Sequence, residues 1–319
     1  MSTEFTNARV LQAFVRLKFF AGRVHHRTRK TLGDTDRSKA MKSTACSSAF
    51  GSAIALALLA TNATAQDPAE GWMAYAVGAM PESVTRITTL EMTWTVGEEP
   101  KHSYAFFSPW FGMDPTDNLN LIQPVNPWGG DSWSMYTEYF QWSPEHNSNS
   151  RQQPVKAGQT LHGALRYDSS SDSYLLSQTV LETGATSTQT VKCQDGKKYL
   201  VPYVVYEKTF PCGSYPPDGV VTFKNITVEC ETATGGVKDC KDLVQWSAKY
   251  KDDNCNMRAH VDSSDQIRIT WDTSMASKYD NMGQSELEAL NTRGRTGWAQ
   301  DLLAARKEKA AATASVEAA

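Results

Sequence analysis

The sequence has little of several features that mark common protein classes. Its 319 residues carry a formal net charge of -3, with 32 Lys and Arg against 35 Asp and Glu. A chain without a basic excess has no electrostatic support for binding nucleic acid or an anionic membrane. Only six cysteines occur, and neither a Cys-x-x-Cys nor a His-x-x-x-His spacing is found. We therefore expect no zinc site, no other metal and no cofactor.

Long amphipathic helices are missing between residues 85 and 278. The chain shows instead short alternating runs rich in Val, Ile, Thr and aromatic residues, separated by Gly, Pro, Asn and Asp, which is typical of β-strands. A parallel sheet would need crossover helices, so we predict an all-β, antiparallel β-sandwich of the jelly-roll, concanavalin-like type. The expected strands are Arg86–Val96, Ser103–Met113, Trp133–Trp142, Thr160–Tyr167, Ser173–Glu182, Thr186–Cys193, Tyr199–Phe210, Val220–Cys230, Gln245–Tyr250 and Ile267–Thr273.

No apolar run is long enough to suggest a permanent membrane anchor. The run Ala49–Ala60 is shorter than the roughly 20 residues that a spanning helix needs. It follows the positive start Met41-Lys42 and precedes the small residues Ala63-Thr64-Ala65, which is the order of a secretory signal. We therefore predict a signal peptide over 41–65, a secreted mature chain and no membrane association after cleavage.

The remaining chain divides into three parts. Residues 1–40 are rich in Arg, Lys and His, and are either an artefact of start-site choice, with the true start at Met41, or a targeting extension. Residues 66–278 form the expected sandwich. Residues 279–319 contain a capping-box pattern at Ser285, which predicts a short helix, and end in a stretch rich in Lys, Glu and Ala, which predicts a disordered tail.

The cysteine pattern fits export. Five cysteines remain after the predicted signal, so we expect two disulfide bridges and one free thiol. Cys230 and Cys240 flank a turn-rich hairpin tip and are expected to pair, whereas Cys193, Cys212 and Cys255 compete for the second bridge. The sequence Asn225-Ile-Thr is also an N-glycosylation sequon, which the secretory route would make usable.

One stretch combines aromatic and polar residues in a way that suggests a binding face. It reads Ser-Pro-Trp110-Phe-Gly-Met-Asp114, continues to Gln123 and ends in the Tyr-rich segment Tyr136–Trp142. On adjacent strands, such residues would line one sheet face with aromatic rings and a few orienting polar groups. The expected ligand is an extended polypeptide or polysaccharide, and a monomer suffices to bind it.

At these residues the sequence resembles the glutamic peptidases, or eqolisins, which are secreted acid proteases built as a jelly-roll β-sandwich. The family has a Ser-x-Trp-x-Gly-x-Asp segment, a catalytic Gln about ten residues later and a Tyr-rich strand ending in Trp-x-Pro. The resemblance spans about half of the mature chain and includes Val155–Leu161 and Val220–Asn225. The matching positions are Ser108, Trp110, Gly112, Asp114, Gln123, Trp142 and Pro144.

The resemblance implies a Gln/Glu mechanism, in which a carboxylate activates water and the Gln amide stabilises the oxyanion. Gln123 answers to the Gln. On the strand Tyr203–Phe210, Tyr203 occupies the position of the family's catalytic Glu and Glu207 that of its second Glu. Because these two side chains share a strand face, the sequence predicts Gln123 and Glu207 as the catalytic pair. The predicted substrate-binding residues are Trp110, Asp114, Trp133, Tyr136, Gln141 and Tyr203, with Gln141 standing where the family has an acidic residue.

A non-proteolytic function on the same sandwich is the alternative. A carbohydrate-binding module or polysaccharide lyase could use Trp128, Trp133, Tyr136 and Tyr139 as stacking platforms. A lyase would also need a basic group near a Tyr, and Arg258 with His260 is the candidate cluster.

Overall fold

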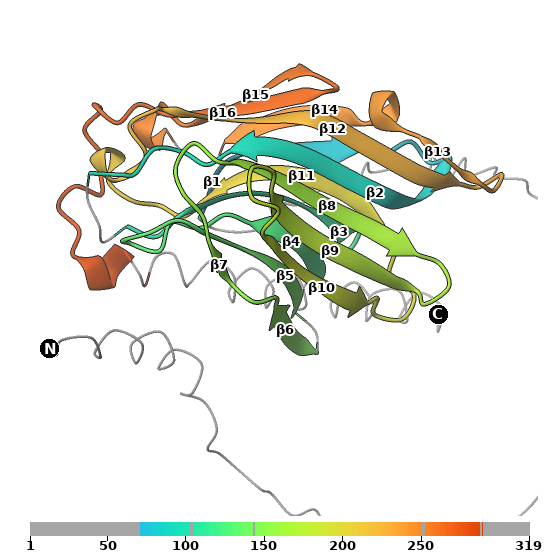
Figure 1. Ribbon diagram of the computed structural model, residues 1–319. Coiled ribbons are helices and arrows are strands. Elements are labelled where there is room, and N and C mark those ends of the chain that lie inside the picture. Colours follow the sequence, from blue (N-terminus) through green and yellow to red (C-terminus); the bar gives the residue numbers. More distant parts are fainter. Residues whose placement is uncertain (1–70, 102–104, 143, 251–252, 288, 290–319) are drawn as a thin grey trace, which may run out of the picture. The chain divides into compact units, whose positions relative to one another are not determined.

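The described part of the molecule is a two-layered β-structure (Figure 1). The computed structural model describes residues 71–101, 105–142, 144–250, 253–287 and 289. The predicted signal peptide, residues 1–40 and nearly all of the predicted disordered tail lie outside the described residues. Two eight-stranded sheets form the layers, and the pairings between their strands are antiparallel.

Sheet A carries the segment that the sequence singled out. Its hydrogen-bonded order is β14-β1-β11-β3-β4-β5-β6, with β7 paired to β5. In that order the strands are β14 (Gln245–Tyr250), β1 (Trp72–Ala79), β11 (Tyr199–Glu207), β3 (Ser108–Pro115), β4 (Asn120–Val125), β5 (Ser134–Trp142), β6 (Glu145–Asn149) and β7 (Gln153–Pro154).

Sheet B forms the second layer. Its order is β10-β9-β8-β2-β12-β16-β15, with β13 paired to β12. The strands are β10 (Thr186–Lys192), β9 (Ser173–Val180), β8 (Thr160–Asp168), β2 (Val84–Thr95), β12 (Val220–Thr232), β16 (Gln266–Thr270), β15 (Arg258–Ser263) and β13 (Val237–Asp239).

The main core lies between the two sheets and explains the alternating sequence pattern. In β12, buried and more exposed residues alternate over most of the strand, as expected when one face packs inward. Trp94 of β2 packs against Phe111 of β3, with ring centroids 5.8 Å apart, and against Phe223 of β12 at 5.3 Å. Burial of such a ring stabilises a fold by about 1.5–3 kcal/mol, so these contacts hold the layers together.

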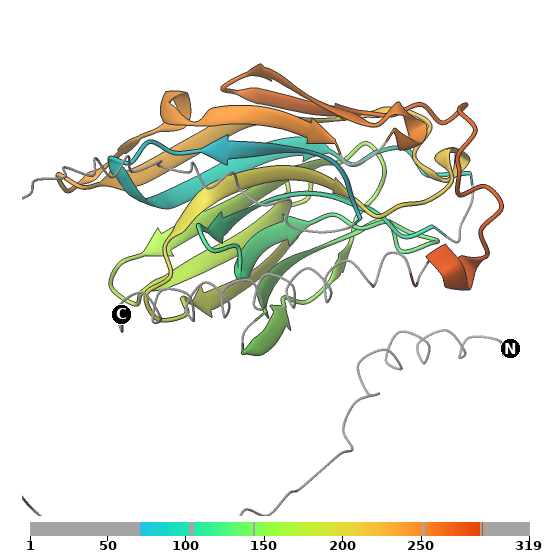
Figure 2. The same cartoon turned by 180° about the vertical axis from the view of Figure 1, so that it is seen from behind.

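The predicted antiparallel all-β sandwich is confirmed, and so is a short helix near the C-terminus, at residues 284–287 (red in Figure 2). The sequence-based prediction omitted β1, β4, β6, β7, β13 and β15. Within the described ranges, no helix is both long and apolar enough to span a membrane.

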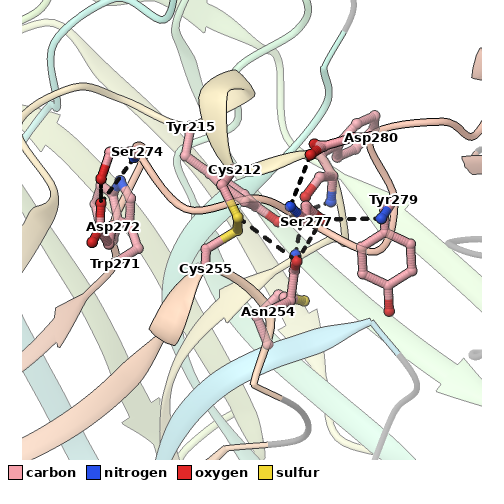
Figure 3. The surroundings of a disulfide bond; sticks show 12 residues. Cys212, Tyr215, Asn254, Cys255, Trp271, Asp272, Ser274, Ser277, Tyr279 and Asp280 are labelled. Atoms are coloured by element: carbon pink, nitrogen blue, oxygen red, sulfur yellow. Dashed lines mark hydrogen bonds between the residues drawn. A yellow bond between two sulfur atoms is a disulfide. The ribbon is translucent and has the colours of Figure 1, made fainter.

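Two disulfides fasten the connections between strands. Cys230 pairs with Cys240, as expected, and Cys212 pairs with Cys255, while Cys193 is a buried thiol. Figure 3 shows the second bridge beside Asn254, which accepts a hydrogen bond from Ser277 Oγ at 2.6 Å. Asn254 Nδ2 also donates to the carbonyl of Phe210 at 3.0 Å. The bridge and the Asn254–Phe210 hydrogen bond tie the segment after β11 to the segment before β15, and the hydrogen bond from Ser277 adds the segment after β16.

Removal of the two bridges is expected to have unequal effects. The Cys212–Cys255 bridge closes a separation of 43 residues and the Cys230–Cys240 bridge one of 10. Chain entropy then predicts losses of about 4 kcal/mol and about 3 kcal/mol in the free energy of unfolding. Urea unfolding of the double variants Cys212→Ser/Cys255→Ser and Cys230→Ser/Cys240→Ser measures both losses. A larger loss for the shorter loop would contradict this explanation.

Candidate functional site

The candidate site lies on the outer face of sheet A, which we define as the face turned away from sheet B. Alternate residues of β3, β4 and β11 point into the main core, and the intervening ones form a second apolar cluster. This outer cluster contains Trp72, Tyr75, Trp110, Leu121, Val125, Tyr203 and Val205, with Val77, Tyr136, Phe140, Trp142 and Val201 packed against it.

Strand register places four residues of this face in one row. Tyr203 of β11 pairs with Gly112 of β3, and Gln123 of β4 pairs with Glu138 of β5. The β3–β4 pairs Trp110–Val125 and Met113–Ile122 put Gly112 opposite Gln123. Tyr203, Gly112, Gln123 and Glu138 therefore follow one another across four neighbouring strands.

Gln123 and Glu138 are in direct contact within that row. Gln123 Nε2 donates a hydrogen bond to Glu138 Oε2 at 2.5 Å, and both residues are buried. Asn147 of β6 donates to the other carboxylate oxygen, Oε1, at 3.3 Å. Gln123 Oε1 has no hydrogen-bond partner among the described residues. The pair thus joins a carboxylate to an amide that is fixed by a single hydrogen bond.

Gly112 allows the close approach of β3 and β4 at this row. A Cβ atom at residue 112 would lie 2.6 Å from the carbonyl oxygen of Ile122 and 3.1 Å from Gln123 Cβ. A larger residue would therefore push β4 away and move Gln123. This is a local reason for the glycine in the Trp-x-Gly-x-Asp segment.

Glu207 lies at another place on the same face. It pairs with Ser108, four residues along β11 from Tyr203. Standard strand geometry puts it about 13 Å along the sheet from the Gln123 row and about 10 Å across it. The structure therefore does not bring Gln123 and Glu207 together, although alternation does place both on one face.

Buried polar contacts surround the Glu207 carboxylate. Its Oε2 accepts a hydrogen bond from Trp110 Nε1 at 2.8 Å, and its Oε1 lies 2.6 Å from Lys208 Nζ. Lys208 has φ +88°, a left-handed conformation that is strained for a residue other than glycine, and β11 ends just before it. These contacts give Glu207 and Trp110 an evident structural role.

The other predicted binding residues divide between the two faces of sheet A. Trp110 and Tyr203 are fully buried on the outer face, where both contact Trp72 edge-on, and Tyr136 is half-buried there opposite Val125. Trp133 instead lies in the main core against Phe107 and Trp128, away from the row.

Gln141 also lies on the inner side, since it is three residues from Glu138 on the same strand. It accepts a hydrogen bond from Tyr139 Oη and donates one to the carbonyl of Pro144 at 2.7 Å. Tyr139 belongs to the main core. Gln141 is therefore bound into the interior and does not take part in the row.

Asp114 is buried on the outer face, and burial followed by repulsion from Asp117 raises its pKa well above the usual range for aspartate. Its Oδ1 has no hydrogen-bond partner within the described structure. An ionised carboxylate in this position is poorly stabilised, because its lost hydration is incompletely replaced. The protonated form is therefore favoured.

The raised pKa of Asp114 predicts a pH-dependent effect of Asp114→Asn. A carboxyl whose pKa is higher in the folded state than in the unfolded state lowers the free energy of unfolding once the pH rises above the unfolded-state pKa, which is near 4. The variant should match the parent near pH 4 and exceed it at pH 7 by at least about 1.4 kcal/mol, the free energy that corresponds to one pKa unit. Urea unfolding at both pH values tests this, and a gain that is largest at acid pH would contradict it.

The residues of the alternative function are dispersed. Trp128, Trp133 and Tyr139 lie in the main core, so of the four proposed stacking rings Tyr136 alone belongs to the outer cluster. Arg258 and His260 lie on β15 of sheet B, where Arg258 pairs with Asp253 and His260 contacts Thr270 Oγ1 at 3.0 Å. The described residues contain no group of three or more side chains arranged to hold a metal ion.

Glu138 was not among the residues predicted from the sequence, although the sequence contains a signal that it lies opposite Gln123. β4 and β5 are joined through a tight turn in which Gly129 N donates to the Ser132 carbonyl at 2.9 Å. A hairpin centred between Gly130 and Asp131 pairs residues that lie equally far on each side, which matches Gln123 with Glu138.

The arrangement defines an antiparallel β-sandwich with a Gln–Glu pair on the outer face of one sheet. No protein-family model matches the sequence, and the comparison with curated proteins finds no relative. Among solved structures, scytalido-glutamic peptidase with a transition-state analogue inhibitor is 16% identical, with 64% of this chain and 99% of that chain covered and a TM-score of 0.46.

Two further structures are similar at a lower level. Aspergilloglutamic peptidase from Aspergillus niger is 18% identical, with 52% of this chain and 98% of that chain covered and a TM-score of 0.38. A toad ovary galectin in complex with thio-digalactose is 13% identical, with 48% and 98% covered and a TM-score of 0.30. These similarities concern the fold alone and assign no activity.

Proposed function

We propose that the protein is a secreted acid endopeptidase of the glutamic type, with Gln123 and Glu138 as its catalytic pair. The observation that carries the proposal is the 2.5 Å hydrogen bond between Gln123 Nε2 and Glu138 Oε2. It joins the two groups that a Gln/Glu mechanism requires, and it replaces the pairing with Glu207 that the sequence suggested. The two disulfides agree with an oxidising, extracellular setting.

The chemistry follows from the two side chains. Ionised Glu138 takes a proton from water, which attacks the scissile carbonyl carbon. The Gln123 amide then donates its N–H to the developing oxyanion. Protonated Glu138 returns the proton to the leaving nitrogen as the C–N bond breaks. Activity is expected in acid, because the glutamic peptidases that the sequence resembles are acid proteases.

The substrate is proposed to be an extended polypeptide bound by one protein monomer. The half-buried rings of Tyr136 and Phe140 lie on β5 on either side of Glu138 and share its face. Aromatic rings at these positions favour bulky apolar side chains next to the cleaved bond. Gly112 lies between Tyr203 and Gln123 in the row, and because it is a glycine, no side chain occupies the surface between them.

The test is cleavage of denatured casein by the secreted protein between pH 2 and pH 7. Gln123→Ala should abolish cleavage, whereas Gln266→Ala on sheet B serves as the matched control and should not. Absence of cleavage by the parent chain, with binding to a glycan array instead, would favour the carbohydrate-binding alternative.

A further inference from the structure

The pairing of strands in sheet B is irregular at Asn225, which lies on the outer face of that sheet, the face turned away from sheet A. The pairing of β12 with β2 shifts register between Lys224 and Thr227, which marks a β-bulge. Asn225 lies in this bulge with φ +54°, and its side chain is exposed, whereas the next residue, Ile226, is buried in the main core. The bulge therefore directs Asn225 outward while its neighbour anchors the strand.

The bulge coincides with an acceptor sequence for N-linked glycans. Asn225-Ile226-Thr227 has the required Asn-x-Thr spacing, and Thr227 is exposed together with Asn225. Within the chain that follows the predicted signal, this is the sole Asn-x-Ser/Thr sequence without proline at the middle position. The other one, Asn62-Ala-Thr, precedes the predicted cleavage point.

A hollow beside Asn225 offers polar groups to a bound sugar. It has a volume of about 390 Å³, and its lining includes Thr93, Thr95, Asp218, Lys224 and Asn225. Asn225 Nδ2 donates a hydrogen bond to Thr93 Oγ1 at 2.9 Å. A glycosylated amide keeps one N–H, so this hydrogen bond can persist and hold the first sugar against the hollow.

We propose that Asn225 carries an N-linked glycan whose first sugar lies over this hollow. The donor is a lipid-diphosphate-linked oligosaccharide of the secretory pathway. The Asn225 amide nitrogen forms a C–N bond to the anomeric carbon, the bond from that carbon to the lipid diphosphate breaks, and the nitrogen loses one proton. The glycan covers part of the outer face of sheet B and leaves the Gln123–Glu138 row on sheet A untouched.

The first test is expression of the full chain, with its own leader, in a eukaryotic secretory host. Amidase removal of N-glycans should lower the mass by one oligosaccharide and convert Asn225 to aspartate in the peptide map. Asn225→Gln and Thr227→Ala should lack the glycan. Asn256→Gln should keep it, because Asn256 is likewise exposed with a positive φ of 47° but has no sequon. No mass change, or a glycan retained in Asn225→Gln, would overturn the proposal.

The second test addresses the hollow. The parent protein trimmed to a single sugar is compared in thermal unfolding with Thr227→Ala, which keeps Asn225 but carries no glycan. The same two chains from a bacterial host give the baseline difference. A higher melting temperature of the one-sugar form, beyond that baseline, is expected, and a difference equal to the baseline would overturn the contact between sugar and hollow.

Discussion

Glu138→Gln is expected to lower the rate of peptide cleavage by about 10²–10⁴-fold, the contribution of a positioned general base. The substitution keeps the size of the side chain but removes its ability to take a proton from water. It also preserves the possibility of a hydrogen bond with Gln123 Nε2, so the fold should survive. Steady-state kinetics on a fluorogenic peptide at acid pH, together with far-UV circular dichroism, measure both properties.

Glu207→Gln is the matched comparison for this prediction. Both variants exchange a buried carboxylate on the outer face of sheet A for an amide. If Gln123 acts with Glu138, folded Glu207→Gln retains the parent's rate. The reverse result, with Glu207→Gln inactive and Glu138→Gln active, would restore the pairing suggested by the sequence and reject the one suggested by the register.

Lys208→Met is expected to lower the free energy of unfolding by about 3–5 kcal/mol, the usual cost of breaking a buried ion pair. The side chains of Glu207 and Lys208 are only 2% and 12% exposed, with 2.6 Å between Oε1 and Nζ. Methionine keeps the length of the side chain but leaves the Glu207 carboxylate without this counter-charge. Urea unfolding at pH 7 measures the loss.

The double variant Lys208→Met/Glu207→Gln separates charge from packing. Removal of both charges should recover much of the stability lost in Lys208→Met, because an amide is less costly to bury than a carboxylate. Equal losses in the single and the double variant would show that packing of the Lys208 stem, and not the ion pair, determines the effect.

Much of the fold could be predicted from the sequence because most strands show a two-residue alternation. β12 and β8 carry that alternation and were located within a few residues. β4 is buried on both faces and contains Pro124, so it gave no alternation to detect. β1 is also almost wholly buried. It begins close to the predicted signal peptide, so its apolar residues can be interpreted as part of that signal.

The sequence indicated which residues could form a binding face but not which of them meet, because strand phase and register are finer properties than the existence of a strand. Gln123, Trp110 and Tyr203 do share the outer face, but Trp133 and Gln141 belong to the interior. A one-residue difference in phase moves a side chain to the opposite face. Glu207 shares the phase of Tyr203 but lies four residues further along β11 than the Gln123 row, which only the pairing of β11 with β3 reveals.

The hairpin of β4 and β5 has a consequence for how this site could arise and persist. Gln123 and Glu138 are 15 residues apart in sequence, whereas Trp110 and Glu207, joined by the neighbouring hydrogen bond, are 97 apart. The proposed chemistry therefore belongs to one contiguous segment and forms through local contacts, which assemble early because their loop-closure cost is small. Insertions outside residues 120–142 would leave Gln123 and Glu138 within one hairpin, and β3 needs only to keep Gly112 for β4 to retain its place.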